Sequence, residues 1–336
     1  MDRAGGGRLS EVTGVTPGHP VAEGLLPRCT FPPPTTPLVC AVSGGADSLA
    51  LLVLAVLSGC TVTAVHVDHG IRPGSAAEAD VVAAAAALVG AAFRAERVSV
   101  APGPNLEARA RAARFAVLPA EVATGHTMDD QAETVLCNLL RGAGPDGVAG
   151  MRRGPCHPIL GLRRDETRSV CKEARLRWVE DPSNDDPRFL RNRVRSELLP
   201  LCGALAGRDP VPLLARFAAI SADDAALLDG LAADALPDPS SAWALARAPR
   251  PLAARAVRRW LRMAGATPET GGRASEVGAD RHPPTAADVE RVLAVAAGDA
   301  VATEVTGGWR VRRRGGRLLA EPPEATPDPR PVQSRR

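Results

Sequence analysis

The stretch at residues 38–58, which reads LVCAVSGGADSLALLVLAVLS, constrains the fold more than any other part of this chain. It begins as a short apolar run with β-branched residues and breaks at Ser43-Gly44-Gly45. It then resumes as an apolar segment of helical length. A buried strand, a glycine turn and a helix form the simplest interpretation. Because glycine reaches positive φ readily, consecutive backbone N–H groups of such a turn can converge on an anion.

The polar residues of this turn indicate which anion it binds. The hydroxyls of Ser43 and Ser48 can add donors, and the helix opening at Ala46 and Asp47 adds its positive dipole end. Asp47 would repel a phosphate unless Mg²⁺ lay between them. An ordinary strand-to-helix turn capped by Asp47 or Ser48 explains the glycines equally well. The hexapeptide SGGADS lacks the GxxxxGK[ST] pattern, so it is not a Walker loop.

Strands and helices alternate through the first part of the chain. Further strands are predicted at 61–67, 91–100 and 122–125, and helices at 76–89, 105–118 and 128–140. This alternation predicts an α/β fold with a parallel, doubly wound, Rossmann-like sheet. Ligands of such sheets bind at the carboxyl ends of the strands. SGGADS, the Asp68-His69-Gly70 triplet and GHTMDD each follow a predicted strand, which places the site at this edge.

Composition changes along the chain suggest its domain organisation. Residues 1–37, rich in Gly and Pro, are predicted to be a disordered leader, and 322–336 a disordered tail. The catalytic domain is expected at 38–202, with later helices at 168–177 and 189–201, the second ended by Pro200. A smaller, mainly helical domain is expected at 203–321, including a helix at 285–297 and closing with a hairpin at 304–321 that turns at Gly315-Gly316.

Charge and cysteine usage restrict the class of protein. The formal net charge is only +3, and Lys172 is the single lysine, a skew toward arginine that a GC-rich coding bias explains. The seven cysteines are odd in number and contain no CxxC pair, which fits a reducing cytoplasm and argues against a zinc or iron–sulfur site. The apolar runs are too short to cross a bilayer and the N-terminus lacks a signal-peptide core, so a cytoplasmic protein is expected.

The segment ATGHTMDDQAET at 123–134 brings several acidic residues together. Asp130 and Glu133 are three residues apart and therefore share one face of a helix. With Asp129 they could cap the helix, bind Mg²⁺ or hold an ammonium group, and the sequence leaves these three alternatives open. His126 is either a site residue or a loop histidine whose hydrogen bonds are satisfied.

Two arginine-rich segments are candidates for binding negative charge. In NLEARARAARF, at 105–115, Arg111 and Arg114 share a helical face, for which solvation is the default explanation. Between residues 141 and 195 there are 13 basic residues against 8 acidic ones. That excess fits an RNA backbone, and it fits a solvated surface as well.

The order of these motifs resembles the tRNA(Ile)-lysidine synthetases, a family of the N-type ATP pyrophosphatase (PP-loop) superfamily. The resemblance rests on SGGADS, HVDHGIRPGSAAEAD, NLEARARAARF, GHTMDDQAET, PIL, WVEDPSN and RNRVRSELLP, and it covers 38–202 densely. It implies a ligase that uses ATP to adenylate O2 of the wobble cytidine, C34, of tRNA(Ile) with a CAU anticodon. The ε-amine of free lysine then attacks C2 and expels AMP. The product, lysidine, changes codon specificity from AUG to AUA.

The resemblance also implies roles for individual residues. The implied ligands of the ATP phosphates and Mg²⁺ are Ser43, Gly44, Gly45, Ala46, Asp47 and Ser48, and those of the rest of the nucleotide are Asp68, His69, Gly70 and His126. Asp130 and Glu133 would position the lysine ammonium or the metal, with Asp47 and Asp130 as metal ligands. The implied phosphate-stabilising residues are Arg111 or Arg114 with Arg193, and those supporting the loop over the site are Arg191, Asn192 and Arg195.

One departure from the family pattern and several rival functions complete the prediction. The chain has no tyrosine, so the aromatic residue after Arg114 is Phe115, and tRNA binding is expected within 203–321, with Trp309 and 310–314 as candidates. A structural domain edge explains that hairpin equally well. The alternatives are a PP-loop 2-thiocytidine-type tRNA enzyme, which would use cysteine pairs, a non-catalytic nucleotide or RNA-binding module, and a small-molecule amide ligase. A homodimer is left open.

Overall fold

The computed structural model describes residues 18–68, 70, 75–99, 106–180, 186–265 and 284–323, without the side chains of 75–77, 106–108 and 110–111. The chain divides into two compact units, Met1–Asp223 and Asp224–Arg336. The division falls inside the long helix α10 (Val211–Ala235), whereas the sequence suggested a boundary near residue 202.

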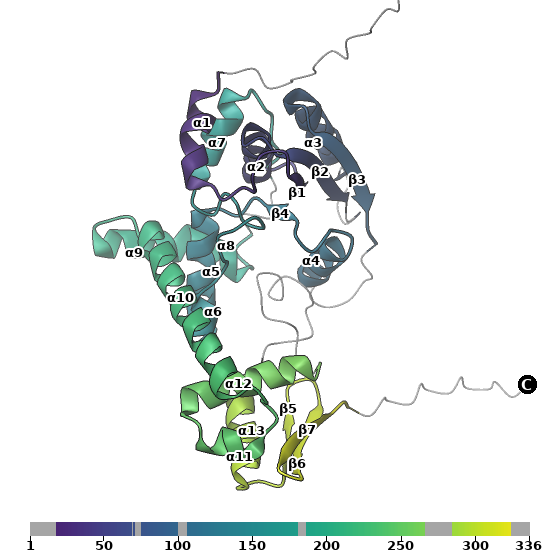
Figure 1. Ribbon diagram of the computed structural model, residues 1–336. Helices are drawn as coiled ribbons and strands as arrows, with labels where there is room; N and C mark the ends of the chain where they lie inside the picture. Colours follow the sequence, from purple (N-terminus) through teal and green to yellow (C-terminus); the bar gives the residue numbers. More distant parts are fainter. Residues whose placement is uncertain are drawn as a thin grey trace, which may run out of the picture. The chain divides into compact units, whose positions relative to one another are not determined.

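The first unit is built on a parallel sheet of four strands, β1 (Pro37–Ala41), β2 (Thr61–Asp68), β3 (Ala92–Arg97) and β4 (Ala123–Thr124). Their order is β3-β2-β1-β4, and all three pairings are parallel. The chain therefore moves outward from β1 and then returns to its other side, which creates a switch point between β1 and β4. The predicted parallel α/β fold is confirmed (Figure 1).

Helices α2 (Ala46–Leu57) and α3 (Ser75–Val89) pack against the strands of this sheet. Further helices of this unit are α4 (Leu106–Ala116), α5 (Met128–Leu140), α6 (Pro145–Val148) and α7 (Arg164–Glu173). Helix α2 is apolar nearly all round, and its residues 49–55 are buried. It contacts both α7 and α1, the N-terminal helix described next (Figure 1). On the opposite face of the sheet, Phe115 packs against Val65 and Val67.

The predicted disorder of the leader is wrong for residues 18–36. Helix α1 (Pro20–Leu25) buries Ala22 and Leu25 against α2 and α7, and a 3₁₀ turn (Leu26–Arg28) follows it. Proline is well suited to the first position of a helix because its missing N–H would be unpaired there anyway. Glu173 of α7 accepts hydrogen bonds from the first backbone N–H groups of α1. Residues 1–17 lie outside the described part of the chain.

The predicted end of a helix at Pro200 is also wrong. Helix α8 (Leu190–Arg193), a π-helical turn (Val194–Leu198) and α9 (Leu199–Ala206) form one continuous helical stretch. Pro200 lies in the first turn of α9, where the wider π-helical turn before it makes the missing N–H and the ring tolerable. The stretch ends at Gly207, which has φ 64°.

The second unit combines helices with a small antiparallel sheet. After the end of α10, its elements are α11 (Ala242–Arg247), α12 (Arg250–Met263), α13 (Ala286–Ala297), β5 (Ala302–Val305), β6 (Trp309–Arg314) and β7 (Arg317–Glu321). Strands β6 and β7 form a hairpin that turns at Gly315-Gly316, and β5 adds a third strand. Within the described residues, no helix combines the length and apolar character needed to span a membrane.

Candidate active site

The SGGADS turn joins β1 to α2 as a closed loop. Gly44 has φ +88°, a conformation that favours glycine, and Gly45 is the N-cap of α2. The Ser48 hydroxyl donates to the carbonyl of Gly45 (2.9 Å) and accepts from the N–H of Ser43 (3.2 Å). Beneath the loop, the buried thiol of Cys171 donates to the carbonyl of Ala46 (3.2 Å). The loop thus lies at the amino end of a helix, where anions are stabilised.

The loop after β4 packs directly on the first turn of α2. A Cβ atom placed on Gly125 would lie 2.8 Å from the carbonyl oxygen of Asp47 and 2.9 Å from Cα of Ser48. Real Cβ atoms do not approach backbone so closely, so glycine alone fits. This contact brings the two loops that flank the switch point together.

Helix α5 begins in this second loop with a capping box. Asp130 accepts from the N–H of Thr127 (2.8 Å), and Thr127 accepts from the N–H of Asp130 (3.4 Å). Capping, one of the three roles that the sequence left open for the acidic cluster, therefore falls to Asp130. Glu133 lies on the same face of α5, and both carboxylates are buried.

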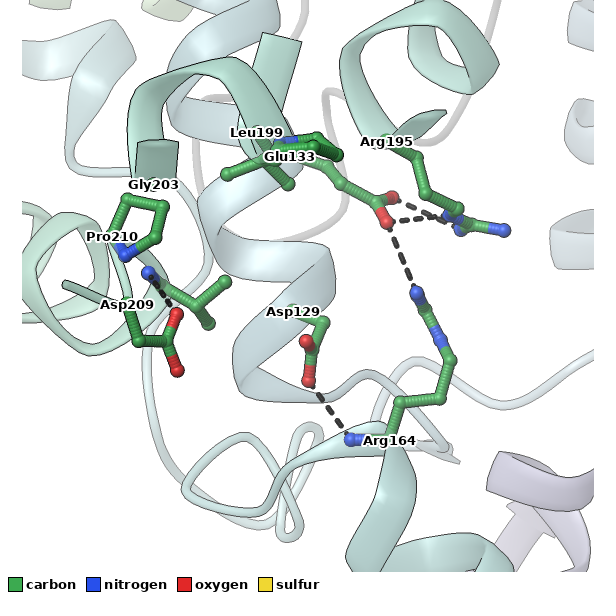
Figure 2. A pocket seen from close by; sticks show the side chains of 10 residues that line it. Asp129, Glu133, Arg164, Arg195, Leu199, Gly203, Asp209 and Pro210 are labelled. Atoms are coloured by element: carbon green, nitrogen blue, oxygen red, sulfur yellow. Dashed lines mark hydrogen bonds and ion pairs between the residues drawn. The ribbon is translucent and has the colours of Figure 1, made fainter. Parts of the chain in front are cut away.

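Three arginines from two separate segments surround these carboxylates. Glu133 accepts from Arg195 Nε (2.6 Å), from Arg191 Nε (2.8 Å) and from Arg164 (3.2 Å). Asp130 Oδ1 accepts from Arg164 and Arg191, each at 3.0 Å. Figure 2 shows Glu133 between Arg195 and Arg164. Buried carboxylates require such compensation, because removing a charge from water without a partner is costly.

Asp47 and Asp130 have opposite electrostatic environments. Burial and, next to it, the negative charge of Asp130 together raise the pKa of Asp47 to about 6. Two contacts oppose this rise: Thr167 donates to Asp47, and Arg164 lies 3.5 Å from it. Burial would raise the pKa of Asp130 as well, but the guanidinium groups of Arg191 and Arg164 hold it well below its usual range. Neighbouring carboxylates with divergent pKa values are typical of functional sites.

A pocket of about 260 Å³ opens beside this cluster (Figure 2). Its lining comes from α5, the start of α7, and the segments around α9 and the start of α10: Asp129, Glu133, Arg164, Arg195, Leu199, Pro200, Gly203, Asp209, Pro210 and Val211. Arg163 ties two of these carboxylates together by contacting Asp129 (3.0 Å) and Asp209. Both signs of charge thus line one small pocket, which suits a zwitterionic ligand.

Two further predicted site residues, Arg193 and Asp68, have other partners in the structure. Arg193 lies at the surface, where it pairs with Glu197 rather than with the acidic pair. Because Arg193 is two residues away from Arg191 and two from Arg195, its side chain points away from the side of the helix that they share. Asp68 ends β2 and accepts from the N–H of Gly70 (2.8 Å), beside strand β1, which leads into the SGGADS loop.

The remaining predictions fall on α4, on the loop after β4 and outside the described residues. Arg114 is half-buried near the end of α4. His126 Nδ1 lies 2.8 Å from the hydroxyl of Thr124, and its ring packs edge-on against His157 at 5.2 Å. His69 and the side chain of Arg111 lie outside the described residues.

Sequence reasoning missed the start of α7, which supplies Arg164 and Thr167. The helix was expected from residue 168, but it begins at Arg164. Asp165 and Glu166, acidic residues in the first turn, are the signal that could have located this start.

The fit of Mg²⁺ can be tested on the carboxylates present. No group of three or more His, Cys, Asp or Glu side chains within the described residues is arranged to hold a metal ion. Mg²⁺ bound with a nucleotide usually needs only one or two carboxylates, because phosphates and water supply the other ligands. Asp47, within the SGGADS loop, fits this requirement. Asp130 fits it less well, since Thr127, Arg164 and Arg191 already engage its oxygens.

Comparison with known proteins agrees with this geometry. The model of the PP-loop domain family matches residues 26–202. The fold and the glycine loop thus define an ATP-binding protein of the PP-loop class.

Curated relatives identify the family within that class. The chain is 44% identical over 244 residues to the tRNA(Ile)-lysidine synthase of Nocardia farcinica, covering 68% of this chain and 77% of the relative. It is 45% identical over 240 residues to that of Mycolicibacterium paratuberculosis, covering 68% and 75%. The chain belongs to the tRNA(Ile)-lysidine synthases, which are ATP-dependent ligases, and the predicted family and enzyme class are confirmed.

Among solved structures, the chain is similar to a U34-tRNA thiolase from Methanococcus maripaludis. The two share 16% sequence identity with a TM-score of 0.44, and the match covers 61% of this chain and 77% of the thiolase.

Proposed function

We propose that this enzyme adenylates O2 of C34 in tRNA(Ile) with a CAU anticodon and joins free lysine to C2. Cytidine O2 attacks the α-phosphorus of ATP, and the bond to the β-phosphate breaks to release pyrophosphate. The lysine ε-amine then forms a bond to C2, AMP leaves with the former O2, and the amine loses a proton. The observation that supports this most is the meeting of a phosphate loop and a charged, amino-acid-sized pocket at one switch point.

On the nucleotide side, residues 43–48 bind the phosphates of ATP. Negative charge builds on the leaving pyrophosphate, and the backbone N–H groups at the start of α2 can stabilise it. Asp47 holds Mg²⁺, which neutralises phosphate charge when bound. Asp68 and Gly70, at the end of the neighbouring strand, contact the rest of the nucleotide.

On the amino-acid side, lysine binds in the pocket beside α5. Its α-carboxylate fits the guanidinium groups of Arg164 and Arg195, and its two ammonium groups fit the carboxylates of Glu133, Asp129 and Asp209. The arginines keep Glu133 fully compensated when the pocket is empty. A carboxylate near the ε-amine can also accept the proton that the amine must lose.

Incorporation of radiolabelled lysine into unmodified tRNA(Ile) transcript, with ATP and Mg²⁺, tests this function. A C34→U transcript and an Asp130→Asn enzyme serve as controls. The proposal predicts that label enters the tRNA only when the wild-type enzyme acts on the transcript with C34. ATP cleavage without lysine incorporation would instead favour another nucleophile, such as the sulfur of a 2-thiocytidine-type enzyme.

Two further parts of the proposal concern assembly. The C-terminal unit binds tRNA, with the exposed Arg310 and Arg314 of β6 as candidates.

The chain also forms a homodimer. The exposed apolar side chains of α9 and early α10 support this: Leu201, Leu205, Phe217 and Ile220. Sedimentation equilibrium over a range of concentrations checks the homodimer, and a monomer at every concentration would contradict it.

A further inference from the structure

Arg164 differs from the other two arginines of the cluster in what it connects. Its Nε lies 3.5 Å from Asp47 of the phosphate loop, while its terminal nitrogens lie 3.0 Å from Asp130 and 3.2 Å from Glu133. One guanidinium group thus joins carboxylates from both sides of the switch point. Its side chain is only 19% exposed and also lines the pocket.

The other arginines do not cross the switch point. In the described part of the chain, Arg191 and Arg195 pair with Asp130 and Glu133 on α5, and neither pairs with Asp47. Glu133 therefore keeps two arginine partners when Arg164 turns away, whereas Asp47 keeps no arginine among the side chains that the structure describes. The position of Arg164 at the first residue of α7 makes this reach possible.

We propose that Arg164 is a positioning residue that couples the nucleotide site to the lysine pocket. The inference rests on the proposed function and assigns a role to a residue that the family motifs did not mark. When bound nucleotide engages Asp47, the Nε–H of Arg164 loses that partner and becomes available to the pocket. A lysine α-carboxylate can then accept from it, so nucleotide binding strengthens lysine binding. By linkage, lysine strengthens nucleotide binding by the same factor.

The planar fork of arginine is essential to this role. A guanidinium group presents donors in several fixed directions, so Nε can serve one carboxylate while the terminal nitrogens serve others. An ammonium group keeps the charge but is a single point on a flexible stem. Arg164→Lys therefore preserves the charge of the cluster and removes the bridge, which separates coupling from charge compensation.

Calorimetric titration of lysine tests the inference directly. The full-length enzyme is titrated with and without α,β-methylene ATP, whose P–C–P linkage prevents cleavage between the α and β phosphates, at constant Mg²⁺. Arg164→Lys and Arg164→Gln are compared with Arg168→Gln, a change on the exposed face of the same helix. Thermal unfolding of each variant checks that it is folded.

In the wild type we expect the analogue to tighten lysine binding by about fivefold or more, the usual range for coupled sites. The factor should fall to near one in Arg164→Lys and stay at the wild-type value in Arg168→Gln. Full coupling in Arg164→Lys, or lysine binding without coupling in the wild type, would overturn the inference alone. Absence of lysine binding to the wild type would overturn the proposed function, and the inference with it.

Discussion

At the scale of single residues, the site places a carboxylate that resists ionisation next to one that is held ionised. Asp47 has the amino end of α2 beside it but also the charge of Asp130, and burial outweighs its contacts with Thr167 and Arg164. Asp130 has two arginines and a capping contact. The free enzyme therefore carries an unfavourable charge at Asp47, which is the position that a nucleotide-bound cation would relieve.

The raised pKa of Asp47 leads to a pH-dependent prediction about stability. Because the folded pKa of about 6 exceeds the ordinary 3.8, the folded state binds the extra proton, and stability is lost as pH rises through this window. Asp47→Asn should therefore raise the free energy of unfolding at pH 7.5 by about 1–3 kcal/mol. The gain should be much smaller at pH 4.5, as urea denaturation at the two pH values can measure. A gain that is equal at both would contradict the assignment.

Glu133 leads to a prediction of the opposite sign. This side chain is fully buried and compensates three guanidinium groups, so Glu133→Gln leaves buried positive charge without a partner. Breaking a buried ion pair in this way costs about 3–5 kcal/mol of stability. Urea denaturation provides the measurement. Glu197→Gln, which breaks an exposed pair with Arg193, is the matched control and should leave the denaturation midpoint unchanged.

Residue-level prediction from sequence succeeded where spacing along one helix carried the information. Asp130 and Glu133, three residues apart, do share a buried face of α5. Their partners could not be found in this way, because Arg164 lies more than thirty residues further along the chain and reaches them only through tertiary packing. The resemblance implied a phosphate-stabilising role for Arg193 and a loop-supporting role for Arg191 and Arg195, and it held no information on which side of the helix faces α5.

At the scale of elements, the site depends on how closely β4 and α2 approach each other. Gly125→Ala would place a methyl group within 3 Å of the α2 backbone, and relieving that overlap must shift one of the two loops. Overpacking of this kind costs about 1–3 kcal/mol. We expect affinity for α,β-methylene ATP to fall by about tenfold.

Equilibrium binding of the analogue checks this prediction. Gly144→Ala is the control, because a Cβ atom there meets no atom within 4 Å. Equal affinities of the two variants would show that the contact between the loops does not position the phosphate loop.

Elements with a strong periodic pattern were predictable, and elements that depend on packing were not. The helix at residues 128–140 was predicted with its observed bounds, since an acidic first turn precedes an amphipathic run. Helix α1 was missed because its composition resembles a disordered segment, and its stability comes from burial of Ala22 and Leu25 against distant helices. The predicted helix end at Pro200 was wrong because the π-helical turn that accommodates this proline cannot be recognised from the proline itself.

At the scale of the whole molecule, binding of a tRNA should depend strongly on salt. Each phosphate contact releases condensed counterions, so removing one arginine lowers the slope of log affinity against log salt by roughly 0.9. We expect Arg310→Ala and Arg314→Ala each to weaken tRNA binding and reduce this slope by about one. Filter binding at several salt concentrations measures it.

The control for this experiment is Arg250→Ala in the same unit, which removes an arginine already paired with Glu290. An unchanged slope in both β6 variants would assign the hairpin a structural role. Calorimetric titration with α,β-methylene ATP alone should be unaffected in all three variants, because the phosphate loop belongs to the other compact unit.

The thiol beneath the phosphate loop gives the enzyme an internal reporter. Burial raises the pKa of Cys171 to about 12, with the charge of Asp47 adding to the effect, and only a thiolate reacts readily with alkylating reagents. Alkylation of Cys171 therefore requires α2 and α7 to separate. Its rate, followed by mass spectrometry of the labelled peptide, would time this opening in the native protein. A nucleotide that binds only the closed form should lower the alkylation rate of Cys171, and the rate should fall further as a larger fraction of the enzyme has nucleotide bound.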